Sequence, residues 1–558
     1  MTKGHKPPIE RAWELLRLEA ADILAIVLYG ALIGFFNLVV PVATSALINT
    51  IAFGTLLQPL VVLSLLVLFF LMLSGALTAL QIYLAEMMKR RLFLRLFSQL
   101  AERYTKLPIE TFSEHYMPEY TNRFFDIVKL QSSLLFLIMD GIALFLSTTI
   151  GLTILAVYHP LFILFDFFFL FNAIFLLGYL LGRHGINTAI QVSTTKYAAA
   201  AWLQELVRNP RVFRTDWGGH FALEKTQALG EQYIAHEHRH FLIVMRQTIG
   251  FLLLRALSHS AVLGIGGYLV IQEKFTLGQL VAAELIVSGI LGSLGRFWKF
   301  LENFYDTMVA LDKTGLLSDL EEEKEIGAPV NFTEKAVNVE IRGLRLQSFE
   351  AERYIDLDMH IKAREIVAIT NYHGDAKNQL FDILGGELGC ELGQVFYNKH
   401  DIKELNKRDL RSGVLLLRDT ETFWGTIHEN ISLNRPDISL VEISEAIEMV
   451  RLTAAFRRFP SGLHTRLLPG GAPLSHDEKR RLLIARAIVM KPFLLLIDEI
   501  LDTIDDDILL NLQEKWLGRK KHPTVIIASQ NPNVLAICHR CYDMAGKKSI
   551  ITKSRRRR

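Results

Sequence analysis

The stretch Ile369-Thr-Asn-Tyr-His-Gly-Asp-Ala-Lys-Asn378 decides the fold of the second half of this chain. It follows the apolar run Glu365-Ile-Val-Ala-Ile369, which predicts a β-strand, and it precedes a helical run from Gln379 to Leu384. A strand, a glycine-containing loop and a helix in this order favour phosphate binding, because N–H groups at the start of the helix face the phosphate.

The loop keeps only part of the pattern GxxGxGK[ST]. Of the three glycines only Gly374 is present, and the lysine is Lys377. Asn371 tolerates left-handed backbone angles better than most residues, so it replaces the first glycine in part. Ala376 tolerates them poorly, and we expect its methyl group to face the phosphates.

Three further residues in or beside this loop bear on nucleotide binding. Asp375 adds a negative charge beside the phosphates. Asn378 stands where a Ser or Thr hydroxyl would hold Mg²⁺, and it is expected to be a weaker ligand. Gln379 completes the set of candidate nucleotide contacts in this loop.

A second apolar run, Phe493-Leu-Leu-Leu-Ile-Asp498-Glu499, lies about 120 residues further on. Asp498 ends this predicted strand, where its carboxylate is placed to hold Mg²⁺ directly or through water, and Glu499 is the candidate base for the attacking water. A strand that merely meets a turn is the alternative. The ordered set of motifs makes that alternative improbable.

The first half of the chain has the composition of a membrane protein. The whole chain has 558 residues, 51% of them hydrophobic, and no Asp, Glu, Lys or Arg lies between Ile23 and Ala85. A membrane-spanning helix needs about 20 apolar residues. Six such helices are predicted, at 23–51, 59–86, 134–158, 161–182, 247–271 and 277–301.

Charge fixes the expected orientation of these helices. The long loops 87–131 and 183–246 are rich in Lys and Arg, whereas the short turns between helix pairs carry one basic residue, Lys274. The positive-inside rule then places both loops, the N-terminus and the C-terminal domain in the cytoplasm. The net charge of +3 hides this asymmetry.

The predicted organisation has five parts. These are an amphipathic N-terminal helix (1–22), a transmembrane domain (23–310), a linker (311–335), a nucleotide-binding domain (336–550) and a basic tail (551–558). Helical extensions of the two long loops are expected to project below the bilayer, and the tail either attracts anionic lipid or is simply solvated.

Taken together, these motifs resemble an ATP-binding cassette (ABC) exporter half-transporter. Gly470-Gly-Ala-Pro-Leu-Ser475 matches the approach to the LSGGQ signature, and Arg480-Arg-Leu-Leu-Ile-Ala-Arg486 matches the helix after it. Asp505 ends a D-loop, and Gly425-Thr-Ile-His-Glu-Asn430 follows the Q-loop position. In the membrane half, Thr276-Leu-Gly-Gln-Leu-Val-Ala-Ala283 resembles the start of the sixth helix of such exporters.

The resemblance implies a multidomain fold. An all-α, six-helix transmembrane domain of the type I exporter kind is followed by an α/β P-loop NTPase-like domain. It also implies ATP and Mg²⁺ as cofactors, a second half-transporter subunit as homodimer or heterodimer partner, an unidentified exported substrate and no nucleic-acid partner. A bacterial inner membrane is the expected location.

The departures from the family pattern gather where ATP would bind. The signature reads Leu474-Ser475-His476-Asp477-Glu478, so that both glycines and the glutamine are replaced. Arg418 holds the Q-loop glutamine position, Ser529 holds the switch-histidine position, and Phe349 is the candidate adenine-stacking residue. We therefore expect weakened nucleotide binding and weak or lost hydrolysis, with a non-hydrolysing scaffold or regulatory subunit as the alternative.

Two smaller features complete the sequence. Arg255 and Glu284 lie within predicted spans, where charges are costly and either pair or mark a pathway. We expect a pair between them, and the alternative is a structural salt bridge or a cytoplasmic extension of the helices. Cys538 and Cys541 form a lone CxxC, for which two small apolar residues near a strand end are favoured over a metal or redox site.

Overall fold

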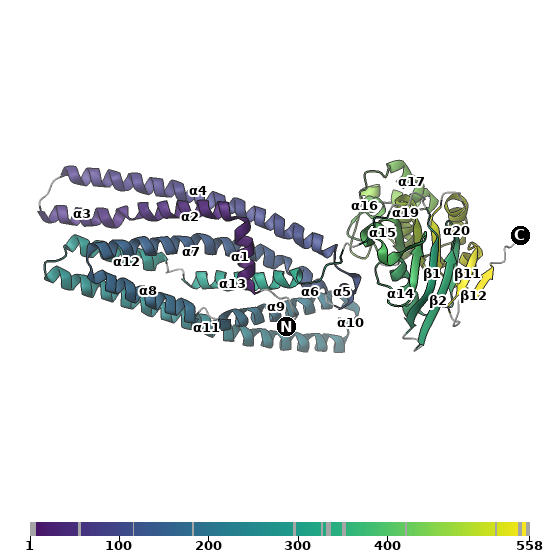
Figure 1. Cartoon of the computed structure of the whole chain (residues 1–558), viewed down its shortest axis with the longest axis horizontal. Helices are drawn as coiled ribbons and strands as arrows, with labels where there is room; N and C mark the ends of the chain where they lie inside the picture. The colour runs from purple at the N-terminus through teal and green to yellow at the C-terminus, as the bar shows by residue number, and fades with distance from the viewer. Residues whose placement is uncertain are drawn as a thin grey trace. The chain divides into compact units, whose positions relative to one another are not determined.

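The computed structural model describes residues 7–53, 57–114, 117–180, 183–293, 297–324, 327–330, 336–348, 353–418, 421–518, 522–544 and 550–553. Contacts divide the chain into two compact units (Figure 1). One contains Met1–Leu107 and Thr111–Glu322, and the other contains Glu323–Arg558 with Pro108–Glu110.

The first unit is entirely helical over its described residues. Its helices are α1 (Pro8–Leu18), α2 (Ala20–Asn37), α3 (Val39–Phe53), α4 (Leu57–Tyr104), α5 (Ile109–Glu114), α6 (Met117–Asn122), α7 (Phe124–Tyr158), α8 (Leu161–Leu180), α9 (Arg183–Arg208), α10 (Pro210–Phe213), α11 (Asp216–Ile271), α12 (Leu277–Ser293) and α13 (Phe297–Ser318).

Four of its helical segments are long and apolar enough to cross a membrane. They are Ala20–Ile51, Gln58–Tyr104, Tyr120–Tyr158 and Asp216–Ile271, and the apolar helices Leu161–Asn172 and Leu277–Gly292 are shorter. Their exposed faces carry many large apolar side chains, as lipid-facing helices require. The chain is therefore an integral membrane protein, and its orientation in the bilayer stays a prediction.

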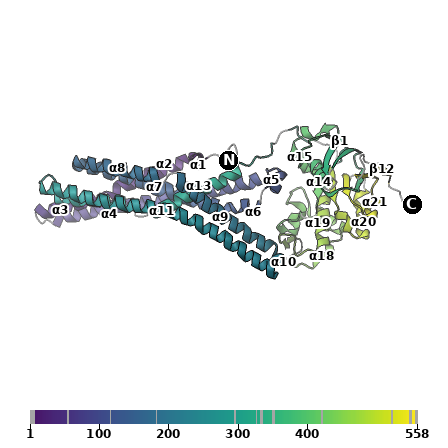
Figure 2. The ribbon, with the colours of Figure 1, turned by 90° about the horizontal axis from the view of Figure 1, so that it is seen from below.

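The two long loops of the sequence prediction consist largely of helix. Helix α4 continues to Tyr104, and α9 and α11 run side by side in both views (Figures 1 and 2). The 56 residues of α11 span about 84 Å at 1.5 Å per residue, far more than one bilayer crossing. The predicted helical stalks are thus continuous with the apolar helices.

The N-terminal helix α1 packs on α13. Leu15 and Leu16 contact the cluster that contains Leu311, while Arg11 forms an ion pair with Asp319 at 2.7 Å. The absence of a side chain at Gly315 makes room for the guanidinium of Arg11, whose Cζ would lie 2.2 Å from an added Cβ. Trp13 is exposed on the opposite side of the helix. The predicted linker 311–335 begins as the end of α13, and its residues 331–335 lie outside the described residues.

The second unit is an α/β domain built on two larger sheets and a short β-ribbon. A six-stranded sheet has the order β12-β11-β3-β10-β9-β6, in which only β12 runs antiparallel to its neighbour, and a four-stranded antiparallel sheet has the order β2-β1-β4-β5. The strands are β1 (Val339–Ser348), β2 (Arg353–Ile361), β3 (Ile366–Thr370), β4 (Gln394–Tyr397), β5 (His400–Asp401), β6 (Val414–Leu417), β7 (Gly425–Thr426), β8 (Arg466–Leu467), β9 (Leu494–Asp498), β10 (Thr524–Ala528), β11 (Arg540–Asp543) and β12 (Ile550–Lys553).

Helices cover both faces of the six-stranded sheet. They are α14 (Gly374–Leu384), α15 (Lys407–Gly413), α16 (Ile427–Ser432), α17 (Leu440–Met449), α18 (Thr453–Arg457), α19 (His476–Met490), α20 (Asp506–Leu512) and α21 (Pro532–Ala536), with short helical turns at Ile402–Glu404, Gly462–His464, Ile500–Thr503 and Gln513–Leu517.

Alternation along the central strands explains this layering. In β3, Ile366 and Ala368 join one apolar cluster with α19, while Val367 and Ile369 join the opposite cluster with α14. Successive side chains of a strand point to opposite faces, so a strand buried on both sides reads as a continuous apolar run. This confirms the predicted fold class, an all-α membrane domain followed by an α/β P-loop domain.

Candidate functional site

The predicted phosphate-binding loop lies between β3 and α14. Asn371 has a left-handed backbone (φ 49°) and donates from Nδ2 to Asp543 Oδ2 at 3.0 Å, so it takes the conformation for which a glycine would serve. Helix α14 begins at Gly374 without a side-chain cap at His373. The start of a helix is where backbone N–H groups bind anions.

Ala376 and Asp375 are neighbours in the first turn of α14. Ala376 is fully buried in the apolar cluster beside Leu380 and has helical backbone angles, so the expectation that its methyl group faces the phosphates is wrong. Asp375 Oδ1 accepts a hydrogen bond from the N–H of Ala376 at 2.7 Å. This carboxylate thus occupies an amide at the helix start and competes with a phosphate for it.

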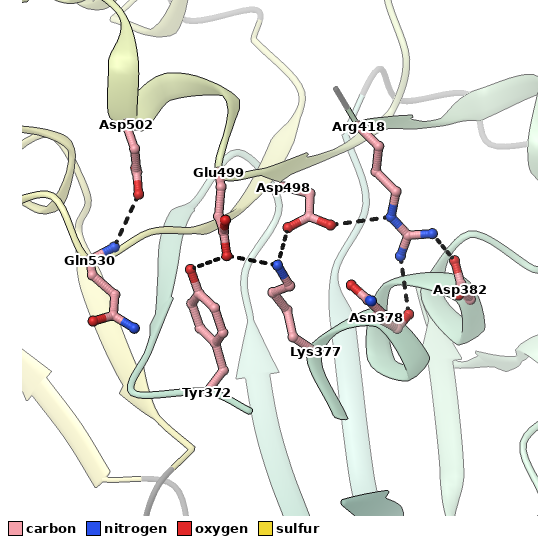
Figure 3. Close-up of polar contacts among 9 residues, drawn as sticks. All are labelled: Tyr372, Lys377, Asn378, Asp382, Arg418, Asp498, Glu499, Asp502 and Gln530. Atoms are coloured by element: carbon pink, nitrogen blue, oxygen red, sulfur yellow. Dashed lines mark hydrogen bonds and ion pairs between the residues drawn. The ribbon is translucent and has the colours of Figure 1, made fainter. Parts of the chain in front are cut away.

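Lys377 lies between the carboxylates of two consecutive residues at the end of β9 (Figure 3). Its Nζ forms ion pairs with Asp498 Oδ1 at 2.6 Å and Glu499 Oε1 at 2.8 Å, and the side chain is 8% exposed. Burial acts to lower the pKa of Lys377, but the contacts with both carboxylates outweigh burial, so the pKa is raised. The lysine is a firmly held cation.

Glu499 is fixed from two sides. Besides Lys377, the hydroxyl of Tyr372 donates to Glu499 Oε1 at 2.8 Å. The contact with Lys377 is the main cause that holds the pKa of Glu499 below its usual value, with Tyr372 adding to it. Burial and the neighbouring Glu499 carboxylate raise the pKa of Tyr372. Glu499 also has a left-handed backbone (φ 57°), which is uncommon outside glycine.

Arg418 follows β6 and binds three groups at once. Its guanidinium donates to Asp498 Oδ2 at 3.2 Å, to Asp382 Oδ1 at 2.6 Å and to the carbonyl oxygen of Asn378 at 3.2 Å (Figure 3). Burial raises the pKa of Asp382, while Arg418 acts in the opposite direction. Both oxygens of Asp498 are therefore paired with side-chain cations.

The Mg²⁺ ion that the resemblance implies does not fit this arrangement. Mg²⁺ requires oxygen ligands in near-octahedral geometry, whereas Asp498 is engaged by Lys377 and Arg418 and Asn378 offers a neutral amide in place of a hydroxyl. A doubly charged ion about 4 Å from a guanidinium would be repelled by about 8 kcal/mol at an effective dielectric near 20. Metal binding at Asp498 would require Arg418 to leave.

The signature residues begin α19 and are largely engaged in local contacts. Ser475 and Glu478 form a reciprocal capping box, and Glu478 Oε2 also accepts from Arg458 at 2.6 Å. Asp477 pairs with Arg481 one turn further along the helix. Glu478 is buried, so the candidate nucleotide contact at this position has a structural role here. His476 is the first residue of the helix.

The predicted switch position directly follows β10. Ser529 is fully buried there, and its hydroxyl donates to Asp502. The next residue, Gln530, is exposed at the carboxyl end of β10 beside Asp502, whose carboxylate accepts from the N–H of Gln530 at 3.4 Å (Figure 3). Gln530 is the side chain that sequence reasoning missed.

The remaining candidates are dispersed. Asp505 is exposed just before α20, and Gln379 Oε1 accepts from the N–H of Gln347 at 3.0 Å instead of remaining free. Phe349 lies outside the described residues. Tyr372 and Asp382 were also missed; Asp382 follows Asn378 by four positions, and that helical spacing was the available signal.

The partner of Glu284 within the apolar helices differs from the predicted one. Glu284 Oε1 contacts His259 Nδ1 at 2.5 Å, while Arg255 is exposed, so the prediction of an Arg255–Glu284 pair is wrong.

Cys538 is buried and its thiol contacts the carbonyl oxygen of Val534 at 3.3 Å. Among the described residues, no group of three or more His, Cys, Asp or Glu is placed to hold a metal ion.

Comparisons with known proteins agree with this fold. Residues 23–294 match the family model for the ABC transporter transmembrane region, and residues 354–502 match the family model for the ABC transporter domain. A solved structure of a bacterial Atm1-family ABC exporter with ATP bound superimposes with a TM-score of 0.79 over 96% of this chain and 94% of that one, at 18% identity.

Curated relatives match part of the chain. The cyclolysin secretion/processing ATP-binding protein CyaB of Bordetella pertussis is 24% identical over 54% of this chain and 43% of its own length, and the alpha-hemolysin translocation ATP-binding protein HlyB of Escherichia coli is 25% identical over 53% and 42%. The matches thus span less than half the length of these relatives. From its two family regions and its fold, the chain belongs to the ABC transporter family, as a half-transporter with a membrane domain fused ahead of its nucleotide-binding domain.

Proposed function

We propose that this chain is one half of a dimeric exporter in which nucleotide binding moves the membrane helices while hydrolysis is weak or lost. The observation that carries this proposal is the engagement of Glu499 by Lys377 and Tyr372. A general base must be able to take a proton from the attacking water. A carboxylate held by an ammonium and a phenol has a lowered pKa and is a poor base.

The phosphate loop supports weakened, not absent, binding. Lys377 becomes available to a phosphate once it turns from the carboxylates, and it lies in the first turn of α14. Asp375 and Glu499 leave negative charge beside the same place, which lowers affinity for a polyanion. We therefore expect ATP to bind, with less affinity than a site with an intact loop would give.

The assembly we propose follows from the half-transporter organisation. A second half-transporter, identical or different, would supply the other membrane domain and the other nucleotide-binding domain. In a heterodimer, one composite site would combine the phosphate loop of this chain with the signature of the partner. The other would combine the partner's phosphate loop with the signature of this chain, so each site would contain one altered motif. The positive-inside rule supports a cytoplasmic nucleotide-binding domain. The match to the membrane-domain family and the bacterial relatives support a location in the bacterial inner membrane.

The alternative is a non-hydrolysing pseudo-ATPase that scaffolds or regulates a partner transporter. The contacts that favour it are the same ion pairs of Lys377, if they persist when ATP is offered. Both proposals predict little hydrolysis, so nucleotide binding separates them.

The test uses the full chain in lipid nanodiscs. We expect measurable ATP binding and a hydrolysis rate that Glu499→Gln leaves nearly unchanged. Rapid hydrolysis that Glu499→Gln abolishes would overturn the proposal in favour of an ordinary pump. Absence of nucleotide binding in wild-type protein that is otherwise folded would favour the scaffold.

A further inference from the structure

The position of Arg418 bears on how this domain binds a nucleotide at all. Its side chain is 28% exposed and is held by Asp498, Asp382 and the carbonyl oxygen of Asn378 (Figure 3). A guanidinium keeps its charge throughout the accessible pH range and binds carboxylates through a rigid planar set of donors. The site therefore contains a permanent, well-anchored positive charge on the carboxylate that would hold a metal ion.

The positive charge of Arg418 repels a divalent cation and attracts a triphosphate. A metal ion at Asp498 would have to displace Arg418 from Oδ2 and Lys377 from Oδ1, and it would be repelled by both. A triphosphate would be attracted by the same two cations. The metal and the side-chain cations thus compete for one place.

Lys377 and Arg418 differ in what they are free to do. Lys377 projects from α14 on a flexible stem, so it can turn from Asp498 and Glu499 to a bound phosphate without moving the helix. Arg418 has two further partners, Asp382 and Asn378, that hold it beside Asp498 after Lys377 has turned. Asp498 then remains neutralised without a metal ion.

From this arrangement we propose that the domain binds nucleoside triphosphate without a divalent cation, with Arg418 as the fixed cation in the metal's place. The inference rests on the proposed function, because it presupposes that nucleotide binds. It goes further in naming the form of the ligand, which is the free ATP anion instead of its magnesium complex.

The test compares binding of fluorescent mant-ATP to the full chain in nanodiscs, once with excess Mg²⁺ and once with EDTA. We expect the two dissociation constants to agree within about threefold. In Arg418→Gln we expect binding in EDTA to weaken at least tenfold and Mg²⁺ to restore part of it. Arg435→Gln removes an arginine from an exposed pair with Asp437 and serves as the matched control that behaves as wild type.

Wild-type binding that weakens tenfold or more in EDTA would overturn the inference and leave the proposed function standing. No binding under either condition would overturn both. Should Arg418→Gln fail to fold, the comparison of wild-type binding with and without Mg²⁺ still decides. Arg418→Lys keeps the positive charge but loses the planar set of donors, so its binding should show intermediate dependence on Mg²⁺.

Discussion

The phenolic hydroxyl of Tyr372 donates a hydrogen bond of 2.8 Å to Glu499, the residue that would act as base for hydrolysis. The tyrosine comes from the phosphate loop and the glutamate from the end of β9, so the contact ties the two motifs of the site together. Lys377 Nζ lies 4.9 Å from the centre of the same ring, which adds a cation–π contact.

Removing this hydroxyl should release Glu499 in part. In Tyr372→Phe one of the contacts that lower the pKa of Glu499 is lost, so that pKa rises and the carboxylate becomes a better base. We expect ATP hydrolysis by the full chain in nanodiscs to increase by a factor of about two to five. Tyr354→Phe, at an exposed tyrosine of β2, is the control. An unchanged rate in Tyr372→Phe would show that Tyr372 does not restrain Glu499.

Glu478 is expected to matter for stability and not for nucleotide affinity. It caps α19 with Ser475 and binds Arg458 while buried, so Glu478→Ala should cost about 1–2 kcal/mol of folding free energy. That loss corresponds to several degrees in apparent Tm. Glu442, which caps α17 in the same way but is more exposed, gives a control with a smaller effect. The assignment fails if ATP affinity falls while Tm stays at the wild-type value.

Much of this site was predictable because parallel strands bring their carboxyl ends to one edge of a sheet. The apolar runs before Asn371 and before Glu499 identified β3 and β9, and the proximity of Lys377 and Asp498 follows from that topology. The sequence prediction of the two motifs therefore needed no knowledge of side-chain contacts.

The side-chain contacts within the site were harder to predict from the sequence. Every residue of β10 is buried, so no alternation in the sequence shows that Ser529 binds Asp502 or that Gln530 is exposed. The sequence likewise does not reveal that Arg418 chooses Asp382 as its second partner, since that contact depends on how β6 and α14 are placed.

Acid should weaken the nucleotide-binding domain partly through Glu365. Burial acts to raise the pKa of Glu365, but Arg540, which contacts both of its carboxylate oxygens, and the N–H of Lys362 lower it overall. Because the folded pKa lies below the unfolded value near 4.5, this stabilisation is complete above about pH 4.5 and is lost as the pH falls through the folded pKa.

The measurement is the apparent Tm of the full chain between pH 7 and pH 3.5. Glu365→Gln should start from a lower Tm at neutral pH and fall less steeply on acidification than wild type. Glu340→Gln, at an exposed pair with Arg342, should follow the wild-type curve closely. Parallel curves for wild type and Glu365→Gln would exclude Glu365 as a source of the acid sensitivity.

Among the polar side chains in the apolar helices, His259 and Glu284 should be coupled to each other, whereas Arg255 should not be coupled to Glu284. The 2.5 Å contact joins α11 to α12, and hydrogen bonds between membrane helices contribute about 0.6 kcal/mol on average and at most about 1.7 kcal/mol. A double-mutant cycle with His259→Ala and Glu284→Ala, read as unfolding in mixed micelles, should show coupling of this size. The matched cycle with Arg255→Ala should be additive, because Arg255 is exposed and Glu284 pairs with His259 instead. Coupling of Glu284 to Arg255 instead of His259 would mean that the two helices pack in a different register from the one described.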